Sequence, residues 1–324
     1  MLLRTMRRHA TIFMLHRFRN PAAGSPGIDP EIVRRGLARL RLDGFRFIGL
    51  TELFERLQAG TDLDGAVAFT IDDGYLDHAT VAAPLFAEFD CPVTTFLCTG
   101  FLDRKLWFWW DQIEFIFDQT GRNSLTVPLT DGPWSRSWAS PEARRAAQRD
   151  FTERCKRVPD AAKHVAVSRL AGEAGVAIPA EPPAQYAPMS WEQARAAENH
   201  GMSFGPHTVT HPVLSRTPDQ QSARELTDSW RRLREELRSP VPVFCYPNGG
   251  SGDFGAREIA VLRGLGLAGA VVGMPGYAGV PCFGATSQAP FLVRRFAYPE
   301  AIPAMLQYAS GLERLKERLR GTES

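Results

Sequence analysis

The sequence predicts an α/β fold built from parallel strand–helix units. Short apolar runs typical of buried strands alternate with helical patterns over the first hundred residues. The alternation stops in a long middle stretch and resumes after about residue 189. Polar clusters follow several of the apolar runs, which is where parallel α/β folds carry their functional residues.

Length and composition restrict the class of protein. The chain has 324 residues and a mass of 35.9 kDa, which suits one α/β barrel or two smaller domains. Hydrophobic residues make up 44% and charged residues 23%, as in ordinary globular proteins. No apolar run reaches the length of a transmembrane helix. The net charge of +2, from 38 basic and 36 acidic residues, does not indicate nucleic-acid binding.

Cysteine usage and the N-terminus bear on the compartment. The five cysteines form no C-x-x-C pair, which favours reduced thiols over a disulfide framework or a four-cysteine zinc site. The apolar stretch Ala10–Leu15 is too short for a signal-peptide core. We therefore expect a cytoplasmic protein.

The first part of the chain contains four expected strands and three expected helices. Pro30 stands at a first helical position behind Asp29 as cap, and Thr51 is the expected cap of the next helix. The expected strands are Ala10–Leu15, Phe45–Leu50, Ala66–Ile71 and Val93–Cys98, and the expected helices are Pro30–Leu42, Thr51–Gln58 and His78–Phe89.

The middle stretch, about residues 103–188, is expected to be a helical insertion within a single catalytic domain spanning residues 1–324. It contains a charged helical segment, about Pro141–Ala174, and the aromatic run Trp107–Trp110. That run either forms a core for the insertion or covers the site as a sugar-stacking lid. Peripheral membrane contact by these aromatics and the basic tail is a further option.

The last part resumes the alternation. Ser190 followed by Gln193 is a capping-box pattern at the start of a helix. The expected helices are Ser190–His200, Pro218–Arg238, Glu258–Leu265 and Glu300–Leu319, and the expected strands are Met202–Gly205, Val241–Tyr246, Gly269–Val272 and Phe291–Phe296.

Asp72-Asp73-Gly74 follows the third apolar run. Strand alternation points Asp72 to the same side as Ala68 and Thr70, and the turn at Gly74 frees Asp73 from that alternation. Two adjacent carboxylates repel each other unless a cation or a proton is present. A simple turn or helix cap is the alternative interpretation.

His207 and His211 stand four residues apart, just after another strand. In a helix this spacing places both imidazoles on one face, where they can bind one zinc ion. The alternative is a pair of histidines satisfied by ordinary hydrogen bonds.

A third cluster, Pro247-Asn248-Gly249-Gly250, follows the apolar run Val241–Tyr246. Its backbone N–H groups either stabilise an oxyanion or belong to an ordinary loop.

Together, one Asp and two His make a three-ligand metal site with an open position, and a second Asp supplies a general base. The order TIDDG, HTVTHP, CYPNGG resembles the polysaccharide deacetylases, also called the NodB-homology or carbohydrate esterase family 4 group. Two flanking segments also resemble that group: MLHR at Met14–Arg17 and TTFLCTG at Thr94–Gly100.

The resemblance implies a distorted (β/α)7-type barrel with a helical insertion, and removal of an N-acetyl group from a carbohydrate. It implies that Asp73, His207 and His211 hold Zn²⁺ or another divalent metal, and that Asp72 is the general base toward metal-bound water. It also implies that the backbone N–H of Asn248 stabilises the oxyanion.

The sequence departs from the family pattern in two places. Cys245 stands where many members carry an Arg that orients the base, and no histidine follows His211 to act as general acid. Arg294 or Arg295 is expected to orient Asp72 instead, with a solvated strand end as the alternative. His16 is a further candidate for the site. The leaving-group proton is expected to come from Asp72 itself or from Asp111.

We therefore expect an enzyme, a zinc-dependent deacetylase acting on a glycan, a lipid-linked sugar or a nucleotide sugar. A deformylase or other amide hydrolase acting on a sugar would use the same site chemistry. A non-catalytic carbohydrate-binding barrel is the rival from another class; it would explain the missing histidine but would have no use for the base.

Overall fold

The computed structural model describes residues 8–63, 65–129 and 132–313 of the chain. Its strands are β1 (His9–Leu15), β2 (Arg46–Phe47), β3 (Ala66–Asp73), β4 (Val93–Leu97), β5 (Ser124–Val127), β6 (Trp134–Ser137), β7 (Met202–Pro206), β8 (Val243–Cys245), β9 (Gly269–Val271), β10 (Ala278–Gly279) and β11 (Phe296–Ala297). Its α-helices are α1 (Pro30–Leu42), α2 (Leu50–Ala59), α3 (Ala83–Ala87), α4 (Thr99–Leu102), α5 (Trp109–Gln119), α6 (Pro141–Cys155), α7 (Asp160–Ala174), α8 (Trp191–Glu198), α9 (Asp219–Glu236), α10 (Ala256–Gly264), α11 (Val280–Phe283) and α12 (Ile302–Ala309).

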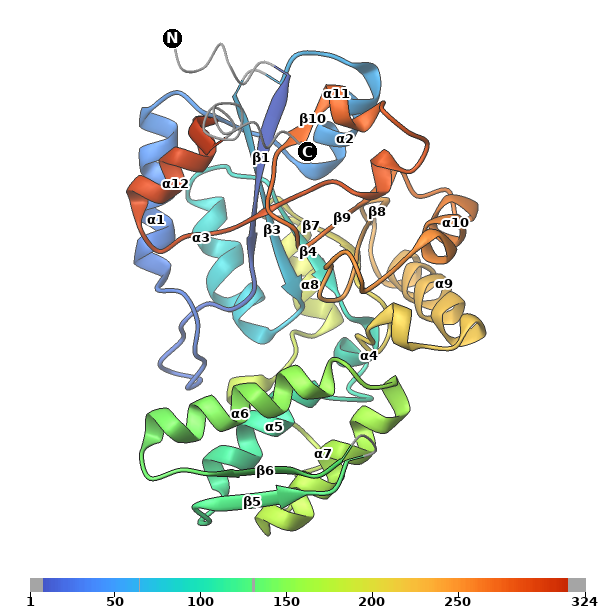
Figure 1. Ribbon diagram of the computed structural model, residues 1–324. Coiled ribbons are helices and arrows are strands. Elements are labelled where there is room, and N and C mark those ends of the chain that lie inside the picture. The colour runs from blue at the N-terminus through green and yellow to red at the C-terminus, as the bar shows by residue number, and fades with distance from the viewer. Residues whose placement is uncertain (1–7, 64, 130–131, 314–324) are drawn as a thin grey trace.

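A mostly parallel sheet forms the centre of the molecule (Figure 1). Its main path runs β10-β1-β3-β4-β7, with β11 also paired to β1 and β2 also paired to β3. Every pairing in it is parallel except that of the short β10 with β1. The parallel strand–helix units predicted from the alternating pattern are therefore confirmed.

Beyond β7 the sheet continues only in part. β8 and β9 pair in parallel as a separate ladder, and no ladder closes the ring within the described residues. Isolated hydrogen bonds bridge the gaps: Val241 N donates to Phe204 O at 2.7 Å, Val272 N donates to Val293 O at 2.9 Å, and Val293 N donates to Ala270 O at 3.1 Å. The predicted fold class is confirmed as an α/β fold of the distorted barrel type, although a closed barrel is not detected in this part of the chain.

Strand alternation divides the buried side chains between two cores. On β3, Val67, Phe69 and Ile71 belong to a core shared with α1, α3 and α12, which cover one face of the sheet in Figure 1. Ala66 and Ala68 belong to a second core, inside the curved sheet, with residues of β8 and β9. Asp72 continues this inward-facing series, as the alternation predicts.

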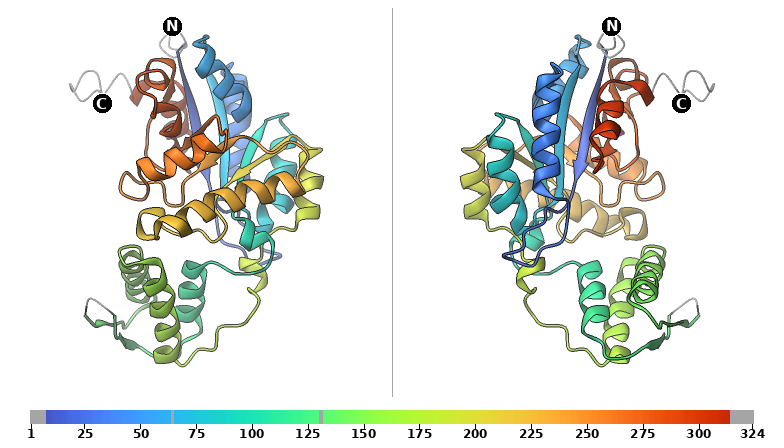
Figure 2. Two further views of the ribbon diagram at one scale, coloured as in Figure 1. Left: turned by 90° about the vertical axis from the view of Figure 1, so that its right-hand side faces the viewer. Right: turned by 90° about the vertical axis from the view of Figure 1, so that its left-hand side faces the viewer.

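The insertion lies beyond one end of the sheet (Figures 1 and 2). It packs α5, α6 and α7 around an apolar core of its own, which includes Ile113, Trp134 and Phe151. It also contains an antiparallel hairpin of β5 and β6, which the sequence analysis did not predict because the two strands are only four residues long. The extent of a single catalytic domain over residues 1–324 stays a prediction.

Several element boundaries differ from the prediction. The cap of α2 is Gly49 rather than Thr51, and the helix predicted from His78 begins with a π-helical turn, His78–Ala82. Pro84 lacks the N–H that an α-helical bond to Thr80 needs, which disfavours a regular helix at this point. The predicted last strand is mostly irregular, with a bridge at Val293 and the two residues of β11.

The terminal helix expected over Glu300–Leu319 is present as α12, and its expected last turns lie outside the described residues. Among the helices that are described, none is both long enough and apolar enough to cross a membrane.

Replacing Phe69 by Ala tests the importance of the core outside the sheet. Phe69 is 1% exposed, and its ring contacts the rings of Phe13, Phe47 and Phe86. Because the truncation leaves a cavity, we expect the free energy of unfolding to fall by about 3–5 kcal/mol. Urea denaturation followed by circular dichroism measures it, and a loss below about 1 kcal/mol would contradict the packing described here.

Candidate metal centre

Two buried carboxylates close strand β3. Asp72 and Asp73 are 3% and 5% exposed, in a strand whose other residues are apolar or hydroxylated. Asp73 has a φ of 92° and Gly74 a φ of 99°, so the backbone turns through the left-handed region at this point. This turn releases Asp73 from strand alternation, as predicted, and both carboxylates reach the same end of the sheet.

The turn after β7 carries the two histidines. Residues 207–211 are not helical, so the prediction that the two imidazoles are one helical turn apart was wrong. Thr208 and His211 both have positive φ, at 68° and 57°, and the Thr208 hydroxyl accepts a hydrogen bond from the His211 N–H at 3.0 Å. The turn still brings the two rings together, with centroids 4.8 Å apart.

Asp73, His207 and His211 converge with a spacing that fits a metal ion. The Asp73 Oδ1 atom lies 3.5 Å from the Nε2 atom of each histidine. Two ligands held about 2.1 Å from a tetrahedral ion are about 3.4 Å apart, so this spacing suits zinc. All three side chains are buried, and their donor atoms form a candidate metal-binding group.

The surroundings of the histidines leave their Nε2 atoms facing Asp73. The His207 Nδ1 atom lies 2.7 Å from the Cys245 carbonyl oxygen, and donation to that oxygen directs Nε2 toward Asp73. Burial lowers the pKa of His207, but the neighbouring Cys245 and Asp73 outweigh it and raise that pKa well above its usual range, so a metal would displace the Nε2 proton. Burial and the neighbouring His207 lower the pKa of His211 to about 3, so that imidazole is neutral at neutral pH. Neutral imidazoles are the form that binds metal.

A second group of possible ligands, Asp72, His207 and Cys245, is less suited to a metal ion. A guanidinium already occupies that space, because Arg295 Nη2 lies 2.8 Å from Asp72 Oδ2 and 3.1 Å from Cys245 Sγ. Burial also raises the pKa of the Cys245 thiol, whereas a metal requires the thiolate.

Asp72 is instead held by a buried arginine. Arg295, 1% exposed, forms two parallel hydrogen bonds of 2.8 Å to the Asp72 carboxylate and a third of 3.0 Å to Thr70 Oγ1. Burial alone would raise the pKa of the Asp72 carboxyl, but the Arg295 charge outweighs it and holds that pKa well below its usual range. Arg294 points elsewhere, with its side-chain carbons against Gly276, so Arg295 is the neighbour of Asp72.

These residues lie in a cavity of about 540 Å³ that the insertion completes. His16 lines it, with its side chain 49% exposed and Nε2 3.8 Å from Asp72 Oδ2. Asn248 also lines it, with a φ of 58°. The cavity is lined by Met14, His16, Arg17, Pro26, Asp72, Asp73, Tyr75, Trp109, Trp110, Asp111, Glu114, Thr152, Lys156, Tyr186, His207, His211, Tyr246 and Asn248.

Backbone strain is concentrated at this site. Six non-glycine residues have positive φ in the described part of the chain, and four of them are Asp73, Thr208, His211 and Asn248. Each such conformation costs on the order of 1–3 kcal/mol and persists only where its surroundings enforce it. This concentration at three separate strand ends is typical of a functional site.

The aromatic run divides between the two predicted roles. Trp107, Phe108 and Trp109 are no more than 5% exposed and pack as core. Trp110 is half-buried, lines the cavity and places its ring 4.6 Å from that of His211. The run is therefore mostly core, and its last member reaches the predicted metal ligands.

Tyr75 and Arg17, which were not among the predicted site residues, connect the insertion to the site. The Tyr75 hydroxyl donates to Asp111 at 2.8 Å and accepts from Trp110 Nε1 at 3.1 Å, and the Arg17 guanidinium lies 3.8 Å from the Tyr75 ring centre. Burial raises the pKa of Asp111 well above its usual range. Tyr75 directly follows the Asp-Asp-Gly motif, which is the one sequence signal that could have indicated it.

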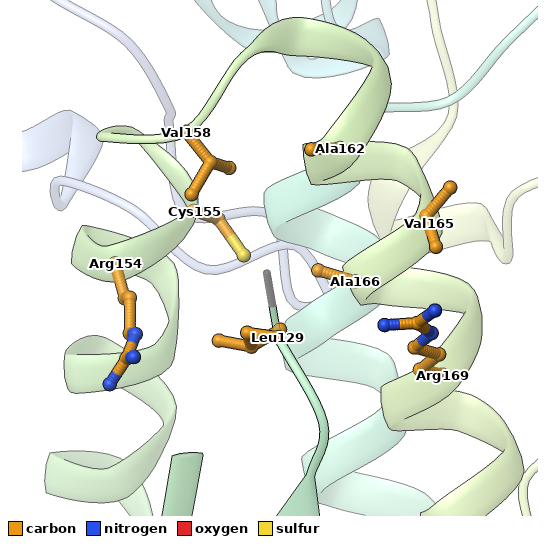
Figure 3. A pocket seen from close by; sticks show the side chains of 8 residues that line it. All are labelled: Leu129, Arg154, Cys155, Val158, Ala162, Val165, Ala166 and Arg169. Carbon is orange, nitrogen blue, oxygen red and sulfur yellow. The ribbon is translucent and has the colours of Figure 1, made fainter. Parts of the chain in front are cut away.

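A smaller cavity of about 100 Å³ lies inside the insertion, between α6 and α7, and contains none of the predicted site residues (Figure 3). The thiol of Cys155 borders it, and burial raises the pKa of that thiol to about 12. Cys91, Cys98, Cys155 and Cys245 are free thiols, consistent with the prediction for these four. The side chain of Cys282 lies outside the described residues.

Metal binding can be measured on the purified protein after chelation. We expect titration calorimetry to detect one Zn²⁺ per chain, and the variants Asp73→Ala and His211→Ala to bind it at least about 100-fold more weakly, because each loses one of three ligands. His164→Ala, at a half-exposed histidine of the insertion, is the control and should bind like the parent. Unchanged affinity in His211→Ala would exclude this ligand set.

Comparison with known proteins shows what this chain is similar to. Residues 166–269, which include both histidines, match the family model described as polysaccharide deacetylase. A search of curated protein sequences found no match.

Similar solved structures cover nearly the whole chain. The deacetylase PplD of Streptococcus pyogenes, in complex with acetate, is 16% identical with a TM-score of 0.60, over 94% of this chain and 99% of that one. IcaB from Ammonifex degensii is 18% identical with a TM-score of 0.58, over 94% and 97%. The BpsB deacetylase domain from Bordetella bronchiseptica is 16% identical with a TM-score of 0.54, over 89% and 95%. The resemblance predicted from the three motifs is thus confirmed: residues 166–269 match the family model, and the chain shares the fold of these solved structures along most of its length.

Proposed function

We propose that the protein is a metal-dependent hydrolase that removes an N-acetyl group from a carbohydrate. The observation that carries the proposal is the placement of Asp73, His207 and His211 beside the arginine-held Asp72, at the bottom of a cavity. Three buried ligands next to one separate carboxylate are the arrangement expected of a hydrolytic metal site. The deacetylases of the same fold support this choice of reaction.

Asp73, His207 and His211 would hold the metal. When bound, a divalent ion such as Zn²⁺ supplies Lewis acidity toward the acyl oxygen and lowers the pKa of a coordinated water. Two imidazoles and one carboxylate also suit cobalt or other divalent ions, so zinc is the first candidate among several.

Asp72 would act as the general base. Its depressed pKa keeps it ionised at neutral pH, and Arg295 fixes the plane of its carboxylate. It takes the proton of the attacking water as the new C–O bond forms. The backbone N–H of Asn248, at a strained turn on the cavity wall, is proposed to donate to the oxyanion that develops.

His16 is the proposed source of the leaving-group proton. The C–N bond breaks as the departing amine takes this proton, leaving acetate and a free amino sugar. His16 lines the cavity, and its Nε2 lies 3.8 Å from Asp72 Oδ2, so a proton can return from Asp72 to His16 between turnovers. It would replace the late histidine that is absent after His211. Of the two sources expected from the sequence, Asp111 is already engaged by Tyr75, and Asp72 would pass its proton on through His16.

The walls of the cavity support a carbohydrate as substrate. Trp110 offers aromatic surface, while Glu114 and Lys156 offer polar atoms for sugar hydroxyls. Candidate substrates are a glycan, a lipid-linked sugar or a nucleotide sugar.

We also propose a cytoplasmic location and peripheral membrane contact. Fractionation of cells would test both.

Acetate release decides between the proposed function and its rivals. The chelated protein is incubated with N-acetylated glycans, nucleotide sugars and lipid-linked sugars, with and without added Zn²⁺. We expect acetate only where metal is restored. Release of formate from formamido sugars alone would indicate a deformylase, and saccharide binding without any hydrolysis would indicate a non-catalytic binding protein.

Asp72→Asn separates catalysis from metal binding. Because Asn keeps the shape but cannot accept the water proton, hydrolysis should fall by a factor of about 10² to 10⁴ while zinc affinity stays within a few-fold of the parent. Asp160→Asn is the matched control, since it alters another Asp that is mostly covered, with 10% of its side chain exposed, and paired with a cation, here Lys163, in the insertion. Its hydrolysis rate should be unchanged. Retained activity in Asp72→Asn would remove Asp72 from the base role.

His16→Gln tests the proton donor. With an N-acetylated sugar, kcat should fall by about 10² and KM should change little, because the amine leaves poorly without a proton. With 4-nitrophenyl acetate, whose leaving group needs no proton, the loss should be much smaller. Equal losses on both substrates would show that His16 does not protonate the leaving group.

A further inference from the structure

The carboxylate of Glu225 contacts the backbone of the histidine turn, residues 207–211, between the two predicted histidine ligands. Glu225, on α9, is 6% exposed and far from the cavity-lining Asp72 in sequence. Its Oε2 atom accepts the backbone N–H groups of Val209 and Thr210, both at 2.8 Å. Its Oε1 atom accepts the Thr210 hydroxyl at 2.6 Å. One side chain therefore makes three hydrogen bonds to two consecutive residues.

The opposite side of the same turn is held by the segment around α4. The Thr99 N–H donates to the Thr208 carbonyl at 3.1 Å, and the Gly100 N–H donates to the Val209 carbonyl at 2.9 Å. A Cβ atom at Gly100 would lie 2.6 Å from the Val209 oxygen, so glycine is needed for this approach. The turn between His207 and His211 is thus anchored on two sides by different elements.

This anchoring matters because the turn is strained. Thr208 and His211 adopt positive φ, which is unfavourable for residues with a side chain. Hydrogen bonds to an ionised acceptor are about twice as strong as neutral ones, so a carboxylate is well suited to hold such a backbone. Without it, the turn would relax, and the 3.5 Å separation between His211 Nε2 and Asp73 Oδ1 would no longer be maintained.

We propose that Glu225 is a positioning residue of the metal centre: through the Val209–Thr210 backbone it holds His211 in the geometry that binds the metal. The proposal rests on the proposed function only in requiring that Asp73, His207 and His211 bind a metal. Outer groups that orient ligands typically change metal affinity by 10- to 100-fold when they are removed.

Zinc titration of apoprotein variants tests this role without using activity. We expect Glu225→Ala to bind Zn²⁺ about 10- to 100-fold more weakly than the parent. Glu225→Gln keeps an acceptor oxygen for the two backbone N–H groups, and its affinity should stay closer to that of the parent than that of Glu225→Ala. This rescue is not expected if the carboxylate only adds general stability.

Glu258→Ala is the matched control. Glu258, on α10, is 2% exposed and also accepts a backbone N–H and a hydroxyl, from Gly255 and Ser222. Its removal should lower the melting temperature but leave zinc affinity unchanged. If Glu225→Ala does not fold, Thr210→Val, which deletes only the hydroxyl bond, carries the test with an expected loss of about threefold or more.

The outcomes separate the two proposals. Parent-like zinc affinity in Glu225→Ala, or equal weakening in Glu258→Ala, would overturn the positioning role while leaving the metal site intact. Failure of the parent protein itself to bind zinc would instead overturn the proposed function.

Discussion

The buried ion pair between Asp72 and Arg295 is the contact on which the site depends. It joins two residues 223 positions apart, at the end of β3 and in the irregular segment before β11. Removing one partner would leave an unpaired buried charge and lower the free energy of unfolding by several kcal/mol. The pair therefore holds the last part of the chain against the centre of the sheet. It also keeps Asp72 ionised and occupies the space beside Cys245, which leaves Asp73 as the carboxylate that faces the two histidines.

The proposed metal centre is assembled from turns rather than from regular structure. Asp73, His211 and Asn248 all have positive φ at or shortly after the end of a strand, and neighbouring elements hold those conformations in place. Glu225 does so for the histidine turn, by bonding the two residues that precede His211. A rigid sheet thus supplies the position of each ligand, and a short strained segment supplies its direction.

The sequence was sufficient to predict the parallel fold, because strand ends are local patterns, and its resemblance to the polysaccharide deacetylases implied the group of Asp73, His207 and His211. It did not reveal how the histidine turn is shaped, since hydrogen bonds from distant helices decide between a helix and a turn. Arg295, rather than Arg294, pairs with Asp72 because of the direction in which its side chain leaves an irregular segment, and local sequence patterns do not predict that direction. Tyr75 and Glu225 were missed because their partners, Asp111 and Thr210, are near them only in space.

Anomalous diffraction from crystals of the protein grown with zinc is the most direct test of the central claim. The account predicts one strong zinc peak within about 2.2 Å of a ligand atom from each of Asp73, His207 and His211. Asp72 should remain bound to Arg295 and outside the coordination sphere. A peak coordinated by Asp72 and Cys245, or no peak near the histidines in crystals that carry zinc elsewhere, would contradict the assignment of ligand and base.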